Sequence, residues 1–371
     1  MAKLLIYGNP ESPLVRERGL IGQEAGHRLY WVSARKARFP GIRAFGLPNF
    51  AGNSFLLRAF LEPLLVRHVL RIVQPDLVHV HYASKGLAAL ALRGKFSLLV
   101  SVMGSDIMPE AGYRGWYATF TRLLLDRADV ITSKSSYMDA VLQSIGDYKD
   151  KVRRIRWGVD LGVFHPRRDT AAFRKRWDII SGALVFFDPR SAKALYNKEI
   201  ILEAFHEYRL ANSPPAVLLI ATSSAEPSYL AFLQRRAREL NLGKAVSFLP
   251  PLSTDEMADA FCLADVTISV PRSDGLPQSL LEAMACGSHL LLGNLPQYAE
   301  IVRGGASVQV LQSLDPQKMA EALLWFADRP EVRATAKEIN PRYVEKNANL
   351  IHEKRRLLDL YGFLLTEKNL T

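Results

Sequence analysis

Short runs of apolar residues alternate with longer segments in which apolar residues recur roughly every three to four positions. In the first half of the chain, the apolar runs cover residues 3–7, 28–32, 77–80, 98–102, 130–132 and 152–157. In the second half they cover residues 183–187, 216–221, 245–249, 266–270 and 289–292. Continuous apolar runs are typical of parallel strands that are buried on both faces, and the intervening segments favour helices. The pattern predicts an α/β protein with doubly wound parallel sheets.

A stretch rich in glycine and proline separates the two halves. It contains Gly158, Gly162 and Pro166, and such composition is typical of a boundary between domains. A chain of 371 residues also exceeds what one hydrophobic core usually serves. We therefore predict one domain at residues 1–165 and a second at 166–349, with a long helical pattern over residues 340–370.

The composition is that of a folded protein in water, with 49% hydrophobic and 23% charged residues. The two cysteines, Cys262 and Cys286, are too few for a disulfide framework or a zinc site, and a reducing cytoplasm fits them. No apolar run reaches the roughly 18 residues needed to span a membrane. The first residues predict a β-strand that ends before Gly8, and no signal peptide.

The net charge of +11 is unevenly distributed along the chain. Residues 1–166 contain 23 Lys and Arg against 13 Asp and Glu, whereas residues 167–371 contain 25 against 24. This asymmetry indicates an anionic partner for the first half. Since the basic residues follow no recognised nucleic-acid-reading motif, we do not expect nucleic acid to be that partner.

Residues 35–73 join basic side chains to an amphipathic helical pattern, which suits the surface of an anionic membrane. The alternative is a core helix whose Arg58, Arg67 and Arg71 form an ordinary solvent-exposed face. Both readings remain open at this stage.

The most informative segment, residues 270–287, reads VPRSDGLPQSLLEAMACG. It follows the predicted strand 266–270, and Pro277 suits the first turn of a helix. Gly275 and Leu276 are therefore expected at the helix N-terminus with free N–H groups. Such a helix end, at the carboxyl edge of a parallel sheet, favours an anion such as a diphosphate.

Two carboxylates accompany this predicted anion site. Asp274 lies on the loop and Glu282 lies within the helix, so they can accept hydrogen bonds from different hydroxyl groups of one elongated ligand. The alternative is that Asp274 is a turn residue and Glu282 a solvated helix residue. No D-x-D motif occurs in the chain, and we predict no metal site.

The segments SDGLPQSLLEAMACG and HLLLGNLPQYAEIV resemble the signature of the family-4 retaining glycosyltransferases. The E-x7-E motif of that family corresponds here to Asp274 and Glu282. The resemblance implies the GT-B fold, with two Rossmann-like domains facing a cleft. It also implies that Asp274 and the backbone of Gly275, Leu276 and Pro277 hold the donor sugar, and that Glu282 holds the nucleotide ribose.

A second motif follows the first strand of the second domain. There the family places an Arg and a Lys on the donor diphosphate, and Arg190 matches the Arg. The family's Lys falls on Tyr196, so Lys193 or Lys198 is expected to substitute for it. The resemblance thus implies that Arg190 and Lys193 act in catalysis and donor binding.

In the first half, residues 100–110 read VSVMGSDIMPE and resemble the family's H-G-x-D loop, which faces the donor sugar. Met103 stands where the family often has His. The resemblance implies donor contacts from Gly104 and Ser105 and a catalytic role for Asp106. The alternative is a turn in which Asp106 caps a helix.

The resemblance implies a metal-independent, retaining transferase that moves a sugar from a nucleotide diphosphate sugar to a glycan or lipid-linked acceptor. Such an enzyme would act in polysaccharide or glycolipid synthesis and would be located at the inner face of the plasma membrane. Gly8 is a further donor-binding candidate, and Gly8-Asn9-Pro10 does not match G-x-G-x-x-G, so no dinucleotide cofactor is expected. In the family the last helix, here about residues 350–371, packs back on the first domain.

Two alternatives to this activity remain. One is a catalytically silent GT-B protein that binds glycan or a partner, for which the departures at Met103, Tyr196 and Asp274 argue. The other is a sugar-nucleotide epimerase, which would need an acid and a base on opposite sides of the sugar.

Overall fold

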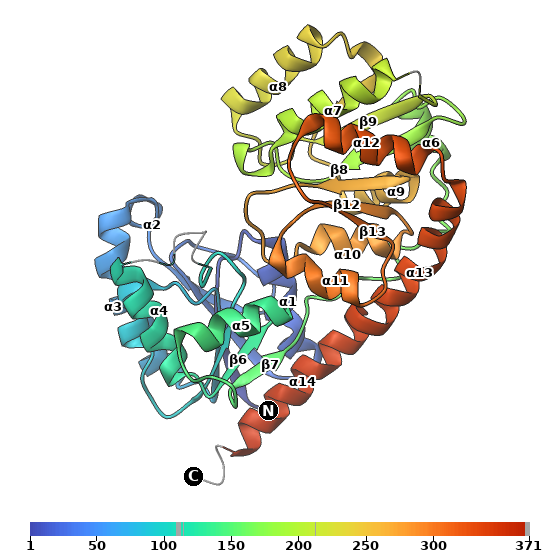
Figure 1. The fold of residues 1–371 in the computed structure, drawn as a ribbon. Helices are drawn as coiled ribbons and strands as arrows, with labels where there is room; N and C mark the ends of the chain where they lie inside the picture. The colour runs from blue at the N-terminus through green and yellow to red at the C-terminus, as the bar shows by residue number, and fades with distance from the viewer. Residues whose placement is uncertain (109–112, 114, 212, 368–371) are drawn as a thin grey trace. The chain divides into compact units, whose positions relative to one another are not determined.

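The structure, a computed structural model, describes residues 1–108, 113, 115–211 and 213–367. Residues 109 and 110 of the predicted 100–110 loop and residues 368–371 of the predicted last helix therefore lie outside the described residues. The chain divides into unit 1, which comprises residues 1–157 and the residues from 351 onward, and unit 2, which comprises residues 158–350. This division lies ahead of the hinge expected near residue 165. Both units are α/β bodies, as Figure 1 shows.

Unit 1 is built on a seven-stranded sheet in the order β3-β2-β1-β4-β5-β6-β7, and neighbouring strands in it are parallel. The strands are β1 Lys3–Tyr7, β2 Arg28–Ser33, β3 Arg43–Gly46, β4 Leu77–His81, β5 Ser97–Ser101, β6 Val130–Ser133 and β7 Val152–Arg154. Leu5 of β1 lies opposite Tyr30 of β2 and Val78 of β4, so the strand order reverses beside β1. Open α/β sheets bind ligands at such a switch point, at the carboxyl ends of the strands.

Helices cover both faces of this sheet. They are α1 Pro13–Glu24, α2 Asn49–Asn53, α3 Phe55–Val73, the 3-10 helix η1 Gly86–Ala91, α4 Gly115–Arg127, α5 Ser136–Ile145 and the terminal α14 Leu350–Glu367. One core cluster joins the sheet to α3, η1, α4 and α5, and the other joins it to α1 and α14. The helix predicted within residues 54–73 is confirmed, because Ser54 caps its first turn through the N–H of Leu57.

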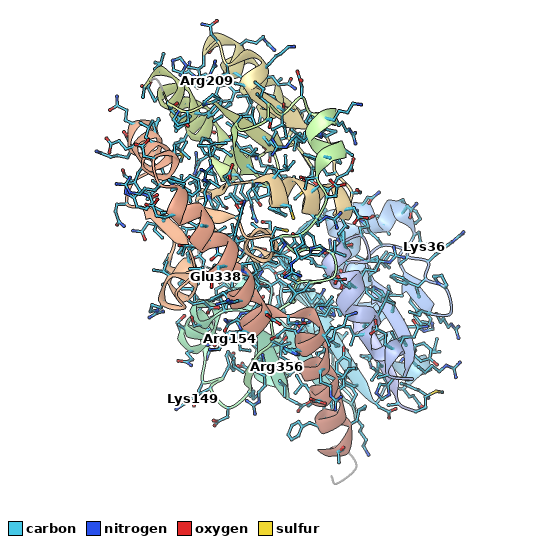
Figure 2. The ribbon with its side chains drawn as sticks, turned by 90° about the vertical axis from the view of Figure 1, so that its right-hand side faces the viewer. Lys36, Lys149, Arg154, Arg209, Glu338 and Arg356 are labelled. Atoms are coloured by element: carbon cyan, nitrogen blue, oxygen red, sulfur yellow. The ribbon has the colours of Figure 1, made fainter. Side chains whose placement is uncertain are left out.

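Helix α14 packs on unit 1 through polar as well as apolar contacts. The Tyr361 hydroxyl lies 2.7 Å from Nδ1 of His79 on β4, and Ser97 Oγ donates to the Leu364 carbonyl at 2.8 Å. Arg356 Nη2 donates to the Arg154 carbonyl at 2.6 Å, and both residues are labelled in Figure 2. The two buried bonds, at His79 and at Ser97, fix the position of the helix on the sheet.

Unit 2 contains a six-stranded parallel sheet in the order β10-β9-β8-β11-β12-β13. The strands are β8 Leu184–Asp188, β9 Ala216–Ala221, β10 Val246–Leu249, β11 Val266–Ser269, β12 His289–Gly293 and β13 Val308–Leu311. The order reverses between β8 and β11. The two parallel sheets confirm the doubly wound α/β class predicted from the apolar runs.

The helices of unit 2 form two layers, which can be followed in Figure 1. They are α6 Ala171–Arg176, η3 Ala194–Tyr196, α7 Lys198–Leu210, α8 Pro227–Glu239, η4 Gly243–Ala245, α9 Thr254–Leu263, α10 Gln278–Ala285, η5 Pro296–Tyr298, α11 Ala299–Arg303, α12 Pro316–Ala327 and α13 Pro330–Ala348. One core cluster packs α7, α8 and α12 on the sheet, and the other packs α9, α10 and α13 on it. Among the described residues, no helix has the length and apolar character needed to cross a bilayer.

The helical pattern predicted over residues 340–370 forms the end of α13 and the whole of α14, and the two helices are separated at Asn349. Val159 forms a parallel bridge with Asn349, its N–H donates to the Ala348 carbonyl at 2.7 Å, and its carbonyl accepts from the Leu350 N–H at 3.0 Å. The linker therefore forms hydrogen bonds with backbone groups that would be bonded within the helix if it were continuous. For this reason α13 ends and α14 begins there.

Candidate active site

The carboxyl ends of β8 and β11 form the switch point of the unit 2 sheet. β8 ends at Asp188 and leads into the loop that carries Arg190, whereas β11 ends at Ser269 and leads into the loop that carries Asp274. Because adjacent parallel strands deliver their following loops to the same edge, the sheet brings together two segments that are distant in sequence.

An ion pair joins two of the predicted site residues at this edge. Arg190 Nη2 lies 2.9 Å from Asp274 Oδ2, and the two side chains are only 15% and 9% exposed. The guanidinium also donates to Ser279 Oγ at 3.1 Å and to the Tyr196 hydroxyl at 3.2 Å, and it lies 4.6 Å from the centroid of the Tyr196 ring. Burial alone lowers the pKa of Arg190, but Asp274, Tyr196 and Tyr298 outweigh it and the net shift is upward. The site therefore contains a charged and oriented guanidinium.

Two polar atoms in this cluster lack a well-aligned hydrogen bond to any described residue, namely Arg190 Nε and the Tyr298 hydroxyl. Tyr298 ends η5, and its side chain is buried. Burial and the neighbouring Asp274 raise the pKa of Tyr298, so its hydroxyl keeps its proton. Buried polar atoms nearly always have partners, so this cluster is suited to receive polar groups of a ligand.

The two lysines expected as substitutes occupy different environments. Lys198 is fully buried at the start of α7, and its Nζ lies 2.6 Å from Asp188 Oδ2. The other oxygen of Asp188 accepts the N–H of Arg190 at 2.9 Å. Burial lowers the pKa of Lys198, and Asp188 partly offsets that shift. Lys198 thus supports the loop after β8 through Asp188, which binds the backbone of that loop. Lys193 is half-buried on the loop itself.

Tyr196 and Asn197 hold the loop that follows β8 against the loop that follows β11. Tyr196 contacts the Arg190 guanidinium with both its ring and its hydroxyl. Asn197 is buried with a φ of 49°, its Nδ2 donates to the Val270 carbonyl at 2.8 Å, and its Oδ1 accepts from Arg272 Nε at 3.0 Å. The position expected to carry the family's lysine therefore orients the arginine instead.

The start of helix α10 differs from the sequence prediction. The helix begins at Gln278, with Pro277 as its N-cap. The N–H of Gly275, which was predicted to be free for an anion, donates to Asp274 Oδ1 at 2.7 Å. That part of the prediction is wrong, because the short Asp side chain reaches the N–H of the next residue.

Leu276 and Glu282 complete this end of the sheet. Leu276 has a φ of 63°, a left-handed conformation that costs a non-glycine residue roughly 1 kcal/mol or more and that clusters at ligand sites. Glu282 lies in the second turn of α10 and is half-buried. Among the residues that the structure describes, no group of three or more His, Cys, Asp or Glu side chains could hold a metal ion.

A cavity of about 410 Å³ lies at the corresponding switch point of unit 1. Gly8, His81 and Met103 are among the residues that line it. A Cβ atom at Gly8 would lie 2.7 Å from Val15 Cγ1 and 3.2 Å from His81 Cβ, so only glycine fits there without displacement. His81 is buried with both ring nitrogens unpaired among the described residues, and burial lowers its pKa well below the usual value. The neutral ring can donate one hydrogen bond and accept one.

Charged side chains occupy the other wall of the same cavity. The Glu62 carboxylate accepts from the Tyr7 hydroxyl at 2.7 Å and from Arg58 Nε at 3.0 Å. Lys85 Nζ lies 4.2 Å from the centroid of the Tyr7 ring, and burial lowers the Lys85 pKa to about 8. The cavity thus presents Arg58 and Lys85 beside the buried Glu62 carboxylate.

The loop after β5 contains three predicted site residues. Asp106 is buried, and its carboxylate accepts the N–H groups of Ala83 at 2.7 Å, Met103 at 3.0 Å and Gly104 at 2.8 Å. These bonds join the loops after β4 and β5, and Gly104 adopts a φ of 126° that strongly favours glycine. Ser105 Oγ lies 3.1 Å from the Tyr82 hydroxyl. The geometry makes Asp106 a residue that positions this loop.

Comparisons with known proteins show the family to which the chain belongs. Residues 22–163 match the model of Glycosyltransferase Family 4, and residues 171–342 match the model of Glycosyl transferases group 1. This chain belongs to the family-4 glycosyltransferases. Its two parallel α/β units are those of the GT-B fold.

Curated relatives of this glycosyltransferase include D-inositol 3-phosphate glycosyltransferases. The protein of Streptosporangium roseum is 25% identical over 70% of this chain and 62% of its own length. That of Streptomyces scabiei is 26% identical over 70% of this chain and 61% of its own length. The chain therefore spans less than two thirds of the length of these relatives.

Solved structures show the same fold at low identity. A sucrose-phosphate synthase from Thermosynechococcus elongatus has a TM-score of 0.83 and 15% identity, covering 99% of this glycosyltransferase and 100% of the other chain. HepE of Anabaena, solved in complex with UDP-glucose, has a TM-score of 0.81 and 14% identity, covering 98% and 100%.

Sequence reasoning missed several residues of this glycosyltransferase that the structure places at the candidate sites. Tyr298 lies within the quoted HLLLGNLPQYAEIV segment, but only the fold brings it beside Asp274. Glu62 lies within a predicted helix, and His81 directly follows the predicted strand 77–80. Both are polar residues at buried positions, and their place in or beside an apolar pattern was the available signal.

Proposed function

We propose that this chain transfers a sugar from a nucleoside diphosphate sugar to a hydroxyl group of a glycan or a lipid-linked acceptor, with retention of anomeric configuration and without a metal ion. The observation that carries the proposal is the partly buried, charged Arg190 at the switch point of unit 2. Support comes from HepE, whose structure contains UDP-glucose, and from relatives named for glycosyl transfer to D-inositol 3-phosphate.

In this proposal the donor diphosphate lies beside Arg190 and Lys193. Cleavage of the glycosidic bond leaves negative charge on the departing diphosphate, and a pre-oriented guanidinium stabilises that charge without reorganisation. The diphosphate would take over the contact that Arg190 makes with Asp274 in the free protein. The Asp274 carboxylate would then accept hydrogen bonds from hydroxyl groups of the donor sugar.

The remaining donor contacts follow the order of the chain. Gly275, Leu276 and Pro277 would pass beside the sugar with their backbone, and Glu282 would accept from the ribose diol. We assign no enzyme nucleophile. In a retaining transfer without one, the leaving phosphate oxygen accepts the proton of the acceptor hydroxyl as that hydroxyl attacks from the same face.

The unit 1 cavity is the proposed acceptor site. Arg58 and Lys85 would attract an acceptor that carries negative charge, and neutral His81 would bind a hydroxyl. Asp106 would keep Gly104 and Ser105 in place at its edge. Polysaccharide or glycolipid synthesis on the cytoplasmic side of a membrane fits such an acceptor.

The activity is tested by incubating the protein with UDP-, GDP- and ADP-sugars and recording both thermal unfolding and release of the nucleoside diphosphate. A donor present at 100 times its dissociation constant adds about 2.7 kcal/mol to the stability of the folded state. A melting shift together with release of the nucleoside diphosphate supports the transferase. A shift without any release would support the catalytically silent alternative.

Glu282→Gln is expected to weaken binding of the preferred nucleoside diphosphate by about 1.5 to 3 kcal/mol, because a neutral amide replaces a charged two-oxygen acceptor. Isothermal titration calorimetry measures this difference. Glu321→Gln, an exposed change on α12, is the matched control and should bind as the wild type does. Equal affinity in Glu282→Gln would remove this residue from the ribose site.

An anionic membrane is the partner that we propose for residues 35–73. The alternative, an ordinary solvated helix, would show mainly polar side chains to water. In α3 the apolar residues Phe55, Leu56, Phe60 and Leu64 are all exposed. Exposed apolar side chains that gather on one helix mark an interaction surface.

A further inference from the structure

A groove of about 780 Å³ lies on unit 1 away from both candidate sites. It is lined by the C-terminal turns of α3, by Gln74 and Pro75 ahead of β4, and by the segment ahead of β5. These segments precede their strands, so the groove lies at the amino-terminal edge of the sheet, whereas the acceptor cavity lies at the carboxyl ends. No part of the proposed transfer reaction accounts for it.

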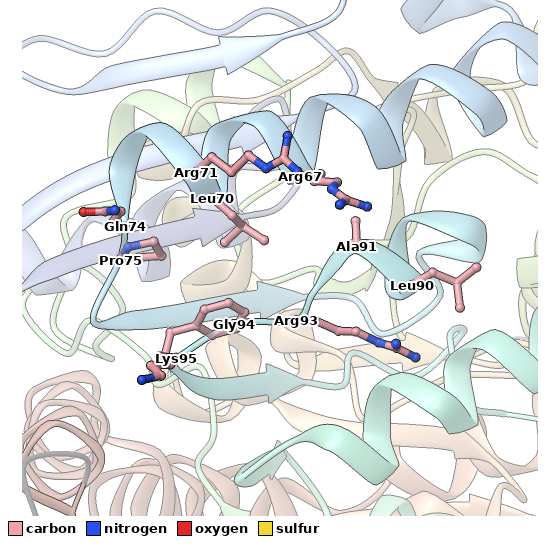
Figure 3. Close-up of a pocket in the computed structure, with 11 residues that line it drawn as sticks. Arg67, Leu70, Arg71, Gln74, Pro75, Leu90, Ala91, Arg93, Gly94 and Lys95 are labelled. Carbon is pink, nitrogen blue, oxygen red and sulfur yellow. The ribbon is translucent and has the colours of Figure 1, made fainter. Parts of the chain in front are cut away.

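Four basic side chains surround this groove, as Figure 3 shows. Arg67 and Arg71 come from α3, and Arg93 and Lys95 come from the segment between η1 and β5. All four residues are exposed, and none of them forms an ion pair with another described residue. The groove therefore concentrates positive charge that the rest of the described chain does not neutralise.

Apolar side chains also line the groove, and they include Leu70, Leu90 and Phe96. A site for a small hydrated anion alone would not need such an apolar lining. The combination suits a ligand that is anionic at one end and apolar just beyond it.

Exposed apolar side chains also form a ridge along α3, the helix that carries Arg67, Leu70 and Arg71. Leu56, Phe60 and Leu64 are 67%, 67% and 63% exposed. With about 3.6 residues per turn, these three residues and the two arginines Arg67 and Arg71 lie within about 80° of one another around the helix. Ridge and groove are consequently one continuous surface, while Val66, Val69 and Val73 occupy the buried face.

Resting on the proposed association with a membrane, we infer that this surface docks on an anionic phospholipid bilayer. The groove receives the headgroup phosphates between Arg67, Arg71, Arg93 and Lys95, and the ridge enters the headgroup region. Charge complementarity selects this occupant, because an anionic bilayer offers phosphates and an apolar interior side by side.

The test is flotation of the full chain with vesicles of phosphatidylcholine alone and of phosphatidylcholine mixed with phosphatidylglycerol. Wild type is expected to float only with the mixed vesicles and to be released by salt. Arg93→Glu with Lys95→Glu should lower the partition coefficient at least about 30-fold, the equivalent of two contacts of about 1 kcal/mol each. Phe60→Ser with Leu64→Ser should lower it without changing the salt dependence. Lys149→Glu with Arg153→Glu, two exposed basic residues elsewhere on unit 1, is the matched control and should lower it far less.

The outcomes separate the role of the groove from the membrane proposal. If the Arg93 and Lys95 variant floats as well as the control, the groove does not bind headgroup phosphates, and membrane association itself still stands. Failure of wild type to float with mixed vesicles would overturn both, and equal flotation with neutral vesicles would overturn the role of charge. Release of nucleoside diphosphate, measured on each variant, reports separately on the transferase and on folding.

Discussion

Replacing Arg190 with alanine is expected to lower the turnover of sugar transfer about 100- to 1,000-fold, the loss typical of removing one pre-oriented charge-stabilising donor. The reason lies in its surroundings: Asp274, Ser279 and Tyr196 hold the guanidinium in a single place. In water a mobile cation would stabilise the leaving diphosphate far less. Steady-state kinetics with the donor identified by the melting panel measures the effect.

Two variants provide the comparison for Arg190→Ala. Lys193→Ala removes a half-buried lysine from the same loop and should reduce turnover much less. Tyr196→Phe keeps the ring beneath the guanidinium but removes the hydroxyl that accepts from it, so an intermediate loss is expected. If Lys193→Ala proves the more damaging change, the diphosphate contact belongs to the lysine.

Replacing Lys198 with methionine is expected to destabilise unit 2 by about 3 to 5 kcal/mol, because it leaves the Asp188 carboxylate buried without its countercharge. Both side chains are essentially inaccessible to water, so solvent cannot take over the role of the lost ammonium. Urea denaturation, with the midpoint and the slope analysed together, measures the change.

A double variant distinguishes a charge effect from a packing effect at this pair. Lys198→Met combined with Asp188→Leu removes both charges, and replacing a buried pair by apolar side chains is often neutral. The double variant should therefore be more stable than Lys198→Met alone. Equal destabilisation of both variants would show that the methylene packing of Lys198, rather than its charge, supports the loop.

The interior strands and the donor motif could be predicted from the sequence because their signals are local. β1, β4, β8, β11 and β12 are buried strands, and their composition of Val, Leu and Ile shows this without any knowledge of neighbours. The edge strands β3 and β13 were missed since three of the four residues in each are only half-buried, so no apolar run marks them.

Loop contacts within the candidate site were harder to predict. Arg190 and Asp274 were both named from their motifs, but their mutual ion pair was not. The sequence also left open which of Lys193 and Lys198 lies on the site, and it placed a free N–H at Gly275 that the structure gives to Asp274. These are contacts of side-chain length, which a difference of one methylene group can redirect.

By itself, the sequence determined the α/β class, the parallel sheets and the segments that carry the site, because each depends on the burial of residues that are close together in the chain. Tertiary structure alone decided that β8 lies beside β11, and with that the pairing of Arg190 with Asp274 and the place of Tyr298. It also decided that α3 shows an apolar ridge to the outside, since either face of that helix could have packed inward. Strand order and helix orientation follow from the packing of the whole core, and no local pattern of residues encodes them.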